Sequence, residues 1–144
     1  RSSAASDVYK RQSIDYGKKL NILGSDISGR AISLAKNNAI NAGVEEDISF
    51  ITRDVSSIAL KDDYGILITN PPYGQRLSDF DTNKIYEKIN NIFKYKETWS
   101  LYFITSDENF DRKFHKKLSK KRKLYNGGQK VDFYQYYGKK PSKN

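Results

Sequence analysis

The sequence predicts an α/β fold, in which a mainly parallel sheet is covered by helices on both faces and ends in an antiparallel hairpin. Short apolar runs alternate with segments of helical periodicity, an alternation typical of βαβ units. The runs are apolar almost throughout, as strands buried on both faces are. Near the C-terminal end, an Asn-Gly-Gly sequence separates two strand-like segments, which indicates a hairpin.

The first predicted βα unit covers residues 20–43. Residues 20–25 form an apolar run that reads as a buried strand, with Asp26 at its end. A helix follows from Ser28, a favoured N-cap, to Ala42, and Gly43 stands at the position where glycine commonly ends a helix. The apolar stripe of this helix consists of Ile32, Ala35, Ala39 and Ala42.

The next two predicted strands both end in polar residues. The first covers residues 48–52 and is followed by Asp54. The second covers residues 65–69 and stops at Asn70-Pro71-Pro72. Neither strand nor helix can pass through the two prolines, because each lacks an N–H group and restricts the residue before it.

The second half of the chain continues the alternation and then changes to antiparallel pairing. We expect a helix over residues 81–94, whose apolar residues recur at helical spacing, and a strand over residues 99–105. A short basic helix is expected over residues 107–118. The hairpin is expected from residues 121–125, a turn at 126–128 and residues 130–137.

Composition excludes several classes of protein. The 144 residues include no cysteine and one histidine, which excludes a disulfide scaffold, a thiolate metal site and a cysteine nucleophile. We therefore expect no metal and a cytoplasmic location. The absence of a long apolar run excludes a transmembrane helix.

The positive charge is concentrated at the C-terminal end. Residues 107–144 contain 12 Lys and Arg against 4 Asp and Glu, so they carry most of the net charge of +9. This asymmetry indicates a polyanionic partner. A solvated basic surface without a partner is an equally open interpretation.

The N-terminal segment differs from the remainder. Residues 2–12 resemble the translation of a transposon-type sequencing adaptor, and the chain contains no methionine. We therefore expect residues 1–12 not to be native and residues 13–144 to be part of a larger catalytic domain.

Polar residues follow three predicted strands, where ligands bind in parallel α/β sheets. Asp26 suits a ribose diol, and Asp54 could accept a hydrogen bond from an adenine amino group; as alternatives, either could be a helix cap or an exposed loop residue. After the third strand, the rigid prolines can hold the Asn70 side chain and the Pro71 carbonyl as paired acceptors. Two such acceptors suit the two hydrogens of a nucleobase amino group, and Tyr73 offers a ring on which an extruded base can stack. A proline-rich turn without a ligand is the alternative.

These motifs resemble those of S-adenosylmethionine-dependent amino-methyltransferases. The resemblance rests on residues 24–27, 35–39, Asp54 and 69–74. Residues 70–77 and the two strings 122–127 and 134–138 further resemble bacterial 23S ribosomal RNA guanine-N2 methyltransferases of the THUMP-associated type. The resemblance implies a Rossmann-like class I methyltransferase sheet, methylation of guanine N2 in ribosomal RNA, and an upstream RNA-binding THUMP domain.

The resemblance also assigns roles to residues. It implies S-adenosyl-L-methionine as cofactor, bound by Asp26, Ile27, Asp54 and Asn70, and a catalytic base-binding motif of Asn70, Pro71, Pro72 and Tyr73. RNA is the implied partner, and the candidates for phosphate contacts are Arg112, Lys116, Lys117, Lys120, Lys121, Arg122 and Lys123.

The sequence departs from this family in two respects, one of which is that the expected THUMP domain is missing. The glycine-rich cofactor loop and the strand before it are absent, and this strand is central in the usual order 3-2-1-4-5-7-6. We therefore expect a truncated sheet, with a gap or a distorted pairing between the strands at Leu20 and Ile66. We also expect the chain by itself to bind the cofactor very weakly.

Two other functions remain open. An adenine-N6 methyltransferase acting on DNA or RNA would use the same Asn-Pro-Pro-Tyr residues. A non-catalytic module could instead bind RNA through residues 112–123 and the tyrosines at 134, 136 and 137, although these tyrosines could equally be packing residues.

Overall fold

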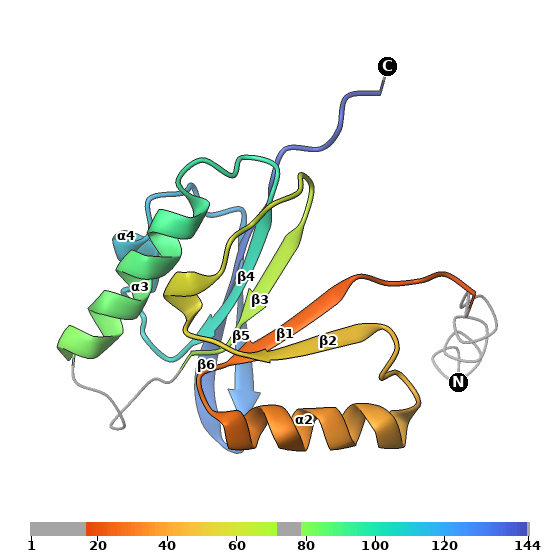
Figure 1. Cartoon of the computed structure of the whole chain (residues 1–144). Coiled ribbons are helices and arrows are strands. Elements are labelled where there is room, and N and C mark those ends of the chain that lie inside the picture. Colours follow the sequence, from red (N-terminus) through yellow and green to blue (C-terminus); the bar gives the residue numbers. More distant parts are fainter. Residues whose placement is uncertain (1–16, 72–78, 144) are drawn as a thin grey trace, which may run out of the picture. The chain divides into compact units, whose positions relative to one another are not determined.

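The computed structural model describes residues 17–71 and 79–143 (Figure 1). The chain divides into two compact units, residues 1–53 and residues 54–144. The expected non-native segment, residues 1–12, lies outside the described residues, as do Pro72 and Tyr73 of the proposed catalytic motif.

The first unit is a βαβ element. Strand β1 (Ile22–Asp26) pairs in parallel with β2 (Ile48–Thr52), and helix α2 (Gly29–Ala42) connects them. The Ser28 hydroxyl accepts a hydrogen bond from the Ala31 N–H, and Gly43 ends the helix with a φ of 72°. Both ends of this helix are confirmed as predicted from the cap residues. Ile32 and Ala39 of the predicted stripe are buried, Ala35 is half-buried and Ala42 is exposed.

The second unit contains a four-stranded mixed sheet. It consists of β3 (Ile66–Thr69), β4 (Ser100–Thr105), β5 (Lys120–Asn126) and β6 (Gln129–Tyr136), in the order β3-β4-β6-β5. The β3–β4 pair is parallel, and the pairs β4–β6 and β5–β6 are antiparallel. The predicted C-terminal hairpin is therefore confirmed, and its strand β6 joins it to the parallel strands.

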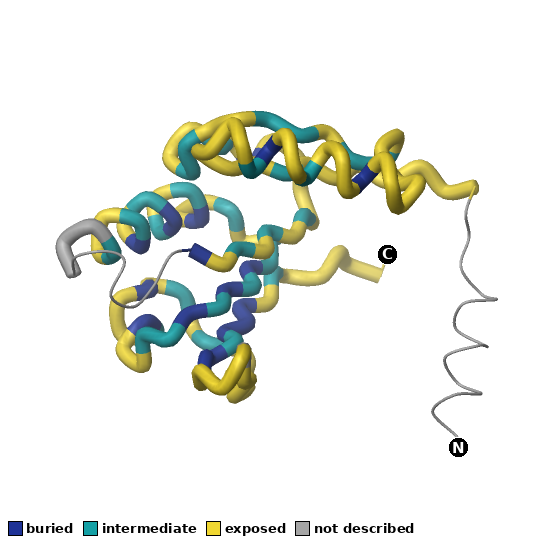
Figure 2. Tube along the Cα trace, turned by 90° about the horizontal axis from the view of Figure 1, so that it is seen from below, coloured by how far each residue is buried: buried dark blue, intermediate teal, exposed yellow. Residues whose placement is uncertain are grey.

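One face of this sheet holds the core of the unit. The short 3-10 helix η1 (Val55–Ser57), α3 (Asp79–Phe93) and α4 (Phe110–Lys113) accompany the sheet, and α3 and α4 lie on the same side of it in Figure 1. Buried residues line α3 and the strands opposite it (Figure 2). The core is rich in aromatic rings: Phe110 stacks on Phe103 with centroids 4.0 Å apart and meets Tyr86 edge-on at 4.8 Å.

The predicted helix over residues 107–118 is wrong in length. Helix α4 covers only Phe110–Lys113, because the next backbone groups bond to the side chain of Asn90 and not to another helical turn. The Asn90 Nδ2 atom donates to the Lys113 carbonyl at 2.9 Å, and the His115 N–H donates to Asn90 Oδ1 at 3.2 Å. A basic run cannot reveal this bond to a residue 23 positions away in the sequence.

The described strands form two separate sheets, β1-β2 and β3-β4-β6-β5. Their orders are those expected for the family once its central first strand is omitted. The predicted gap or distorted pairing between the strands at Leu20 and Ile66 stays a prediction. Both β1 and β3 are edge strands, and Ile22, Leu23, Ile66 and Ile68 are exposed.

We predicted helices on both faces of the sheet. In the described part of the second unit, helices cover one face of the β3-β4-β6-β5 sheet and not the other. Leu67 pairs with buried Leu101 and faces the core, whereas Ile66 and Ile68 face the other side. Ile68 is 70% exposed, which is unusual for a strand residue of this kind. No helix among the described residues is long and apolar enough to span a membrane.

Candidate functional site

Asp26 ends β1 and makes the turn into α2. Its Oδ1 atom accepts a hydrogen bond from the Ser28 N–H at 2.7 Å, the turn that aspartate typically forms two residues before its donor. Its backbone carbonyl accepts from the Arg53 N–H at 2.8 Å. The ends of the two parallel strands of the first unit therefore lie side by side. The carboxylate is exposed, and so is Ile27, at 72%.

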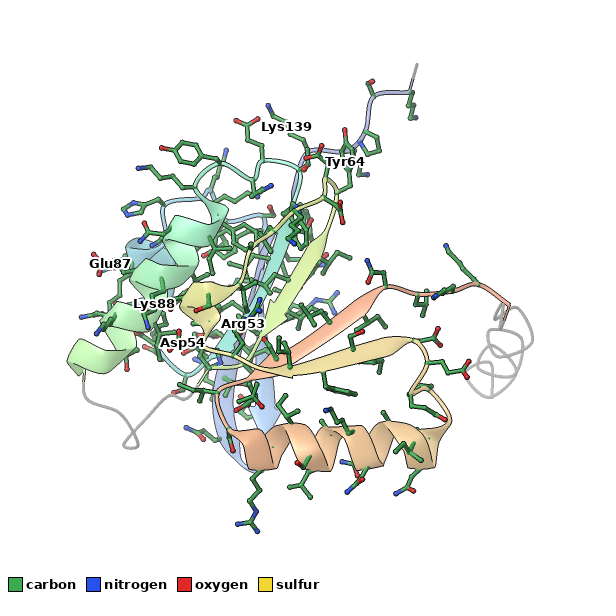
Figure 3. All side chains as sticks on the ribbon, viewed as in Figure 1. Arg53, Asp54, Tyr64, Glu87, Lys88 and Lys139 are labelled. Atoms are coloured by element: carbon green, nitrogen blue, oxygen red, sulfur yellow. The ribbon has the colours of Figure 1, made fainter. Side chains whose placement is uncertain are left out.

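Asp54 begins η1 and is strongly hydrogen-bonded. Its Oδ1 atom accepts from the Ser56 N–H at 2.8 Å, from the Ser56 hydroxyl at 2.7 Å and from Lys88 Nζ at 3.3 Å (Figure 3). The hydrogen bonds from Ser56, followed by the Lys88 contact, lower the pKa of Asp54 from 3.8 to about 2. Asp54 is thus an N-cap, the alternative considered from the sequence, and it is also a carboxylate ionised at neutral pH.

Asn70 and Pro71 follow β3 at the carboxyl edge of the sheet. Thr69, the last residue of β3, pairs with Phe103, and β4 ends two residues later at Thr105. The Asn70 side chain is exposed, whereas Pro71 is buried. The predicted corner, in which the Asn70 side chain and the Pro71 carbonyl act as paired acceptors, stays a prediction. Pro72 and Tyr73 lie outside the described residues.

The same edge contains a polar network that the sequence did not indicate. The Tyr86 hydroxyl lies 3.4 Å from Thr105 Oγ1, which accepts from the Asp107 N–H at 3.1 Å. Burial raises the pKa of Tyr86 to about 12, so the hydroxyl stays protonated at neutral pH. On the neighbouring strand, Asp132 is 2% exposed and its Oδ1 atom has no hydrogen-bond partner among the described residues.

The proposed RNA-contacting residues on β5 do not share one face. In the pairing with β6, Lys121 and Lys123 lie opposite Tyr134 and Asp132, on the face that holds the core. Lys120 and Arg122 therefore point to the other face, because side chains alternate along a strand. Lys121 Nζ lies 3.7 Å from Asp132 Oδ2 and 5.2 Å from the centroid of the Tyr134 ring.

The remaining proposed RNA contacts lie on α4 and after it. Arg112 and Lys117 are exposed. Lys116 is half-buried, and its Nζ donates to the Trp99 carbonyl at 2.9 Å. Desolvation lowers the pKa of Lys116. This lysine is therefore held in place by the fold.

The interpretation of the C-terminal tyrosines as base-stacking groups is wrong for two of the three. Tyr134 and Tyr136 are fully buried. The Tyr136 hydroxyl donates to Asp111 Oδ1 at 2.9 Å, and Tyr134 packs against Phe110 with ring centroids 5.1 Å apart. Both are packing residues, and Tyr137 alone among them is exposed.

Ser56 and Lys88 are the site residues that sequence reasoning missed. Ser56 stands two positions after Asp54, a spacing at which aspartate commonly forms a local turn, so a signal was present. No signal in the sequence indicated Lys88, because it is 34 residues away from Asp54 along the chain. Among the described residues, no three His, Cys, Asp or Glu side chains are grouped as metal ligands.

In each unit a helix follows a strand and leads to a second, parallel strand, which is the α/β arrangement of the class I methyltransferase fold. The chain belongs to the UPF0020 family, described as the RMKL-like methyltransferase domain, which matches residues 3–135.

Two curated relatives support this assignment. The "Putative RNA methyltransferase YpsC" of Bacillus subtilis (strain 168) is 39% identical over 126 residues, which cover 87% of this chain and 33% of the relative. The "Ribosomal RNA large subunit methyltransferase K/L" of Shewanella baltica (strain OS155 / ATCC BAA-1091) is 38% identical over 118 residues, which cover 80% of this chain and 16% of the relative. The chain thus spans a third or less of the length of these relatives.

Solved structures give the same fold. One is "SMU.472, a putative methyltransferase complexed with SAH", with a TM-score of 0.84 and 38% identity over 92% of this chain and 35% of that one. Another is "a predicted N6-adenine-specific DNA methylase from Listeria monocytogenes str. 4b F2365", with a TM-score of 0.76 and 41% identity over 86% of this chain and 32% of that one. The predicted class I methyltransferase fold is therefore confirmed.

Proposed function

We propose that the protein methylates an exocyclic amino group of a base in RNA, and that this base is a guanine of large-subunit ribosomal RNA, methylated at N2. The observation that carries the proposal is the corner after β3, where an exposed Asn70 precedes a buried Pro71. The relatives named as RNA and ribosomal RNA methyltransferases support RNA as the substrate. A ribosomal substrate implies that the protein acts in the cytoplasm.

The chemistry that this corner can perform is orientation of a weak nucleophile. The amino nitrogen of guanine is a poor nucleophile because its lone pair is delocalised into the ring. If Asn70 Oδ1 and the Pro71 carbonyl accept its two hydrogens, the nitrogen moves toward tetrahedral geometry and its lone pair points away from both acceptors. Such preorganised acceptors lower the barrier. The N–CH3 bond would form as the S–CH3 bond breaks, the thioether would leave, and one proton of the methylated nitrogen would then pass to water.

The cofactor that the family supports is S-adenosyl-L-methionine, which supplies a methyl group on a positively charged sulfur. We assign Asp26 to the ribose hydroxyls, since one carboxylate oxygen already makes the turn with Ser28 and the side chain is exposed. Exposed Ile27 can pack against the adenine ring. Asp54, ionised and fixed by Ser56, is assigned to the adenine amino group. Asn70 is assigned to the cofactor as well, as the family resemblance implies.

The proposal is tested by Asn70→Ala in the protein encoded by the complete reading frame. The substrate is ribosomal RNA from cells that lack the gene, and the products are methylated nucleosides separated by mass spectrometry. We expect the unaltered protein to form N2-methylguanosine and Asn70→Ala to lose this activity, with RNA affinity nearly unchanged. Asn41→Ala, at an exposed asparagine on α2, is the matched control and should keep full activity.

Adenine-N6 methylation is the second candidate, and the N6-adenine DNA methylase named among the similar structures favours it. Formation of N6-methyladenosine in place of N2-methylguanosine would support this candidate and refute the guanine assignment. If Asn70→Ala changed neither product while the protein still bound RNA, the catalytic interpretation would be refuted and a binding module would remain.

A further inference from the structure

A groove runs along α3 on the side of residues 110–118. It consists of two adjoining hollows of about 530 Å³ and 410 Å³, and both are lined by Asn90 and His115. The side chain of Asn90 holds the far wall of the groove in place, because its amide group forms hydrogen bonds with the Lys113 carbonyl and the His115 N–H. We call this feature the α3 groove.

The α3 groove is lined with positive charge. Five lysines line the two hollows against two glutamates; the lysines are Lys84, Lys94, Lys96, Lys113 and Lys116. Glu97 is paired with Lys139 at 2.7 Å and Lys113 with Asp107 at 3.2 Å, so one of the two glutamates and one of the five lysines already have an ion-pair partner. Lys94 and Lys96 form no ion pair within 4 Å with any residue that the structure describes.

Lys116 lines the second hollow of the groove and adds a positive charge to its wall. Its Nζ bonds to the Trp99 carbonyl and lies 5.8 Å from the centroid of the Phe93 ring. Neither contact is a carboxylate, and Glu97, which attracts Lys116 electrostatically, is itself paired with Lys139, so the charge of this half-buried ammonium is only partly compensated, which is costly. An anionic group in the groove would compensate it.

The direction of the groove connects it to the catalytic corner. Helix α3 begins a few residues after Pro71, at the edge where the parallel strands end, and its 15 residues extend roughly 22 Å toward the opposite edge. The lining starts near the beginning of the helix at Asn83 and Lys84 and continues past its end to Lys96. A strand whose target base lay at Asn70 could therefore continue along the groove.

An exposed aromatic residue, Tyr95, lines neither hollow but stands in the sequence between Lys94 and Lys96, which line the second. Tyr95 is 81% exposed, directly after α3, and Lys94 Nζ lies 5.4 Å from its ring centroid. Exposed aromatic rings among lysines are the usual platform for unpaired bases, because every base can stack on them whatever its identity. A double helix would not present its bases to such a ring.

We propose that the α3 groove binds the phosphates of single-stranded RNA flanking the target nucleotide and that Tyr95 stacks on one of its bases. This inference rests on the proposed function, since it takes RNA as the substrate. It adds Lys84, Lys94, Lys96 and Tyr95 to the RNA-binding surface and places that surface on α3 rather than on β5 alone.

The test uses the protein from the complete reading frame and a fluorescently labelled single-stranded RNA dodecamer, with affinity measured over a range of salt concentrations. The Lys84→Gln/Lys94→Gln double variant should bind more weakly, and the slope of log K against log salt should fall by about 0.7 for each lysine that contacts a phosphate. Tyr95→Ala should weaken binding roughly 5-fold to 150-fold, the value of one stacked base. The matched control is Lys36→Gln/Lys61→Gln, which removes the same charge from exposed lysines outside the groove.

Equal affinities and equal slopes for the groove and control variants would overturn the proposal. Equal losses on a duplex of the same length would overturn the assignment to single-stranded RNA, and equal competition by polyglutamate would show a nonspecific anion surface. Failure of the proposed function is distinguishable, because Asn70→Ala reports methylation while the groove variants report binding. If the protein methylated no RNA but lost RNA affinity on substitution of the groove lysines, the RNA-binding role of the groove would stand and the proposed methylation would be refuted.

Discussion

Lys88 Nζ lies 3.3 Å from Asp54 Oδ1, which joins the middle of α3 to the start of η1 (Figure 3). Helix α3 begins soon after the Asn70-Pro71 corner, and Asp54 is the carboxylate assigned to the adenine of the cofactor. The ion pair therefore fixes the proposed cofactor carboxylate to the helix that follows the proposed catalytic corner. Because both side chains are partly exposed, we expect the pair to contribute orientation more than stability.

The pKa of Asp54 can be tested directly. The hydrogen bonds from Ser56 are the largest causes of its low value of about 2, and Lys88 contributes less. Ser56→Ala should therefore raise the pKa of Asp54 toward 3.8 more than Lys88→Met does. Carboxyl ¹³C NMR titration measures both changes. A larger effect of Lys88→Met would show that charge, and not hydrogen bonding, dominates.

The same shift predicts how stability depends on pH. Because folding lowers the pKa of Asp54 below 3.8, the ionised group stabilises the folded state above about pH 4, and this contribution is lost as the pH falls toward 2. Asp54→Asn should remove this part of the acid sensitivity, so its melting temperature should fall less between pH 5 and pH 2. An identical acid dependence in both proteins would contradict the prediction.

Local signals in the sequence were enough to predict most of the strands and α2. The cap residues Ser28 and Gly43 determine the ends of α2 through groups within one helical turn, and Asn70-Pro71 ends the strand directly before it. No knowledge of the tertiary structure was therefore needed. The family order with its first strand omitted also agrees with the strand orders of the two described sheets, β1-β2 and β3-β4-β6-β5.

The features that could not be predicted depend on distant residues. The basic run after Asp107 looked helical, but a bond to Asn90 ends α4 at Lys113. The same run was considered as one cationic surface, yet its β5 part alternates between two faces of the sheet. The cations that line a common groove come mostly from α3 and its C-terminal end, where their spacing alone did not distinguish them from a solvated helix.

Asn90 should contribute measurably to stability. Asn90→Ala removes the hydrogen-bond partners of the Lys113 carbonyl and the His115 N–H. We expect a cost of about 1 kcal/mol, because both of these backbone groups can then bond to water. Asn91→Ala is the control, because both substitutions share the same gain in helix propensity. Urea unfolding measures the difference. Equal stabilities would show that the 110–118 segment is held by packing alone.

The β5–β6 turn requires glycine at its second position. Gly127 and Gly128 have φ values of 58° and 86°, the geometry of a two-residue hairpin turn with both residues left-handed. Gly128→Ala should cost roughly 1–2 kcal/mol, because a Cβ atom clashes with the backbone in this conformation. Gly127→Asn should be tolerated, since asparagine adopts this region more readily than other side chains. Urea unfolding that found Gly128→Ala as stable as the parent would contradict the turn geometry.

Asp26 has two roles that a single substitution can separate. Its Oδ1 atom accepts from the Ser28 N–H, and we assign its remaining acceptor capacity to the ribose of the cofactor. Asp26→Asn keeps a carbonyl oxygen for the turn but replaces the other oxygen with a donor and removes the charge. The turn and the stability should therefore be nearly unchanged, while affinity for S-adenosyl-L-methionine falls.

We expect this loss of affinity to be roughly tenfold to a hundredfold, the value of a hydrogen bond to a charged group, measured by calorimetry on the protein from the complete reading frame. Ser28→Ala is the complementary variant: it removes the hydroxyl that accepts from the Ala31 N–H and should lower stability by about 1 kcal/mol while sparing the affinity. If Asp26→Asn bound the cofactor as tightly as the parent, the carboxylate would be only a turn residue, and the assignment of the ribose site to the end of β1 would be wrong.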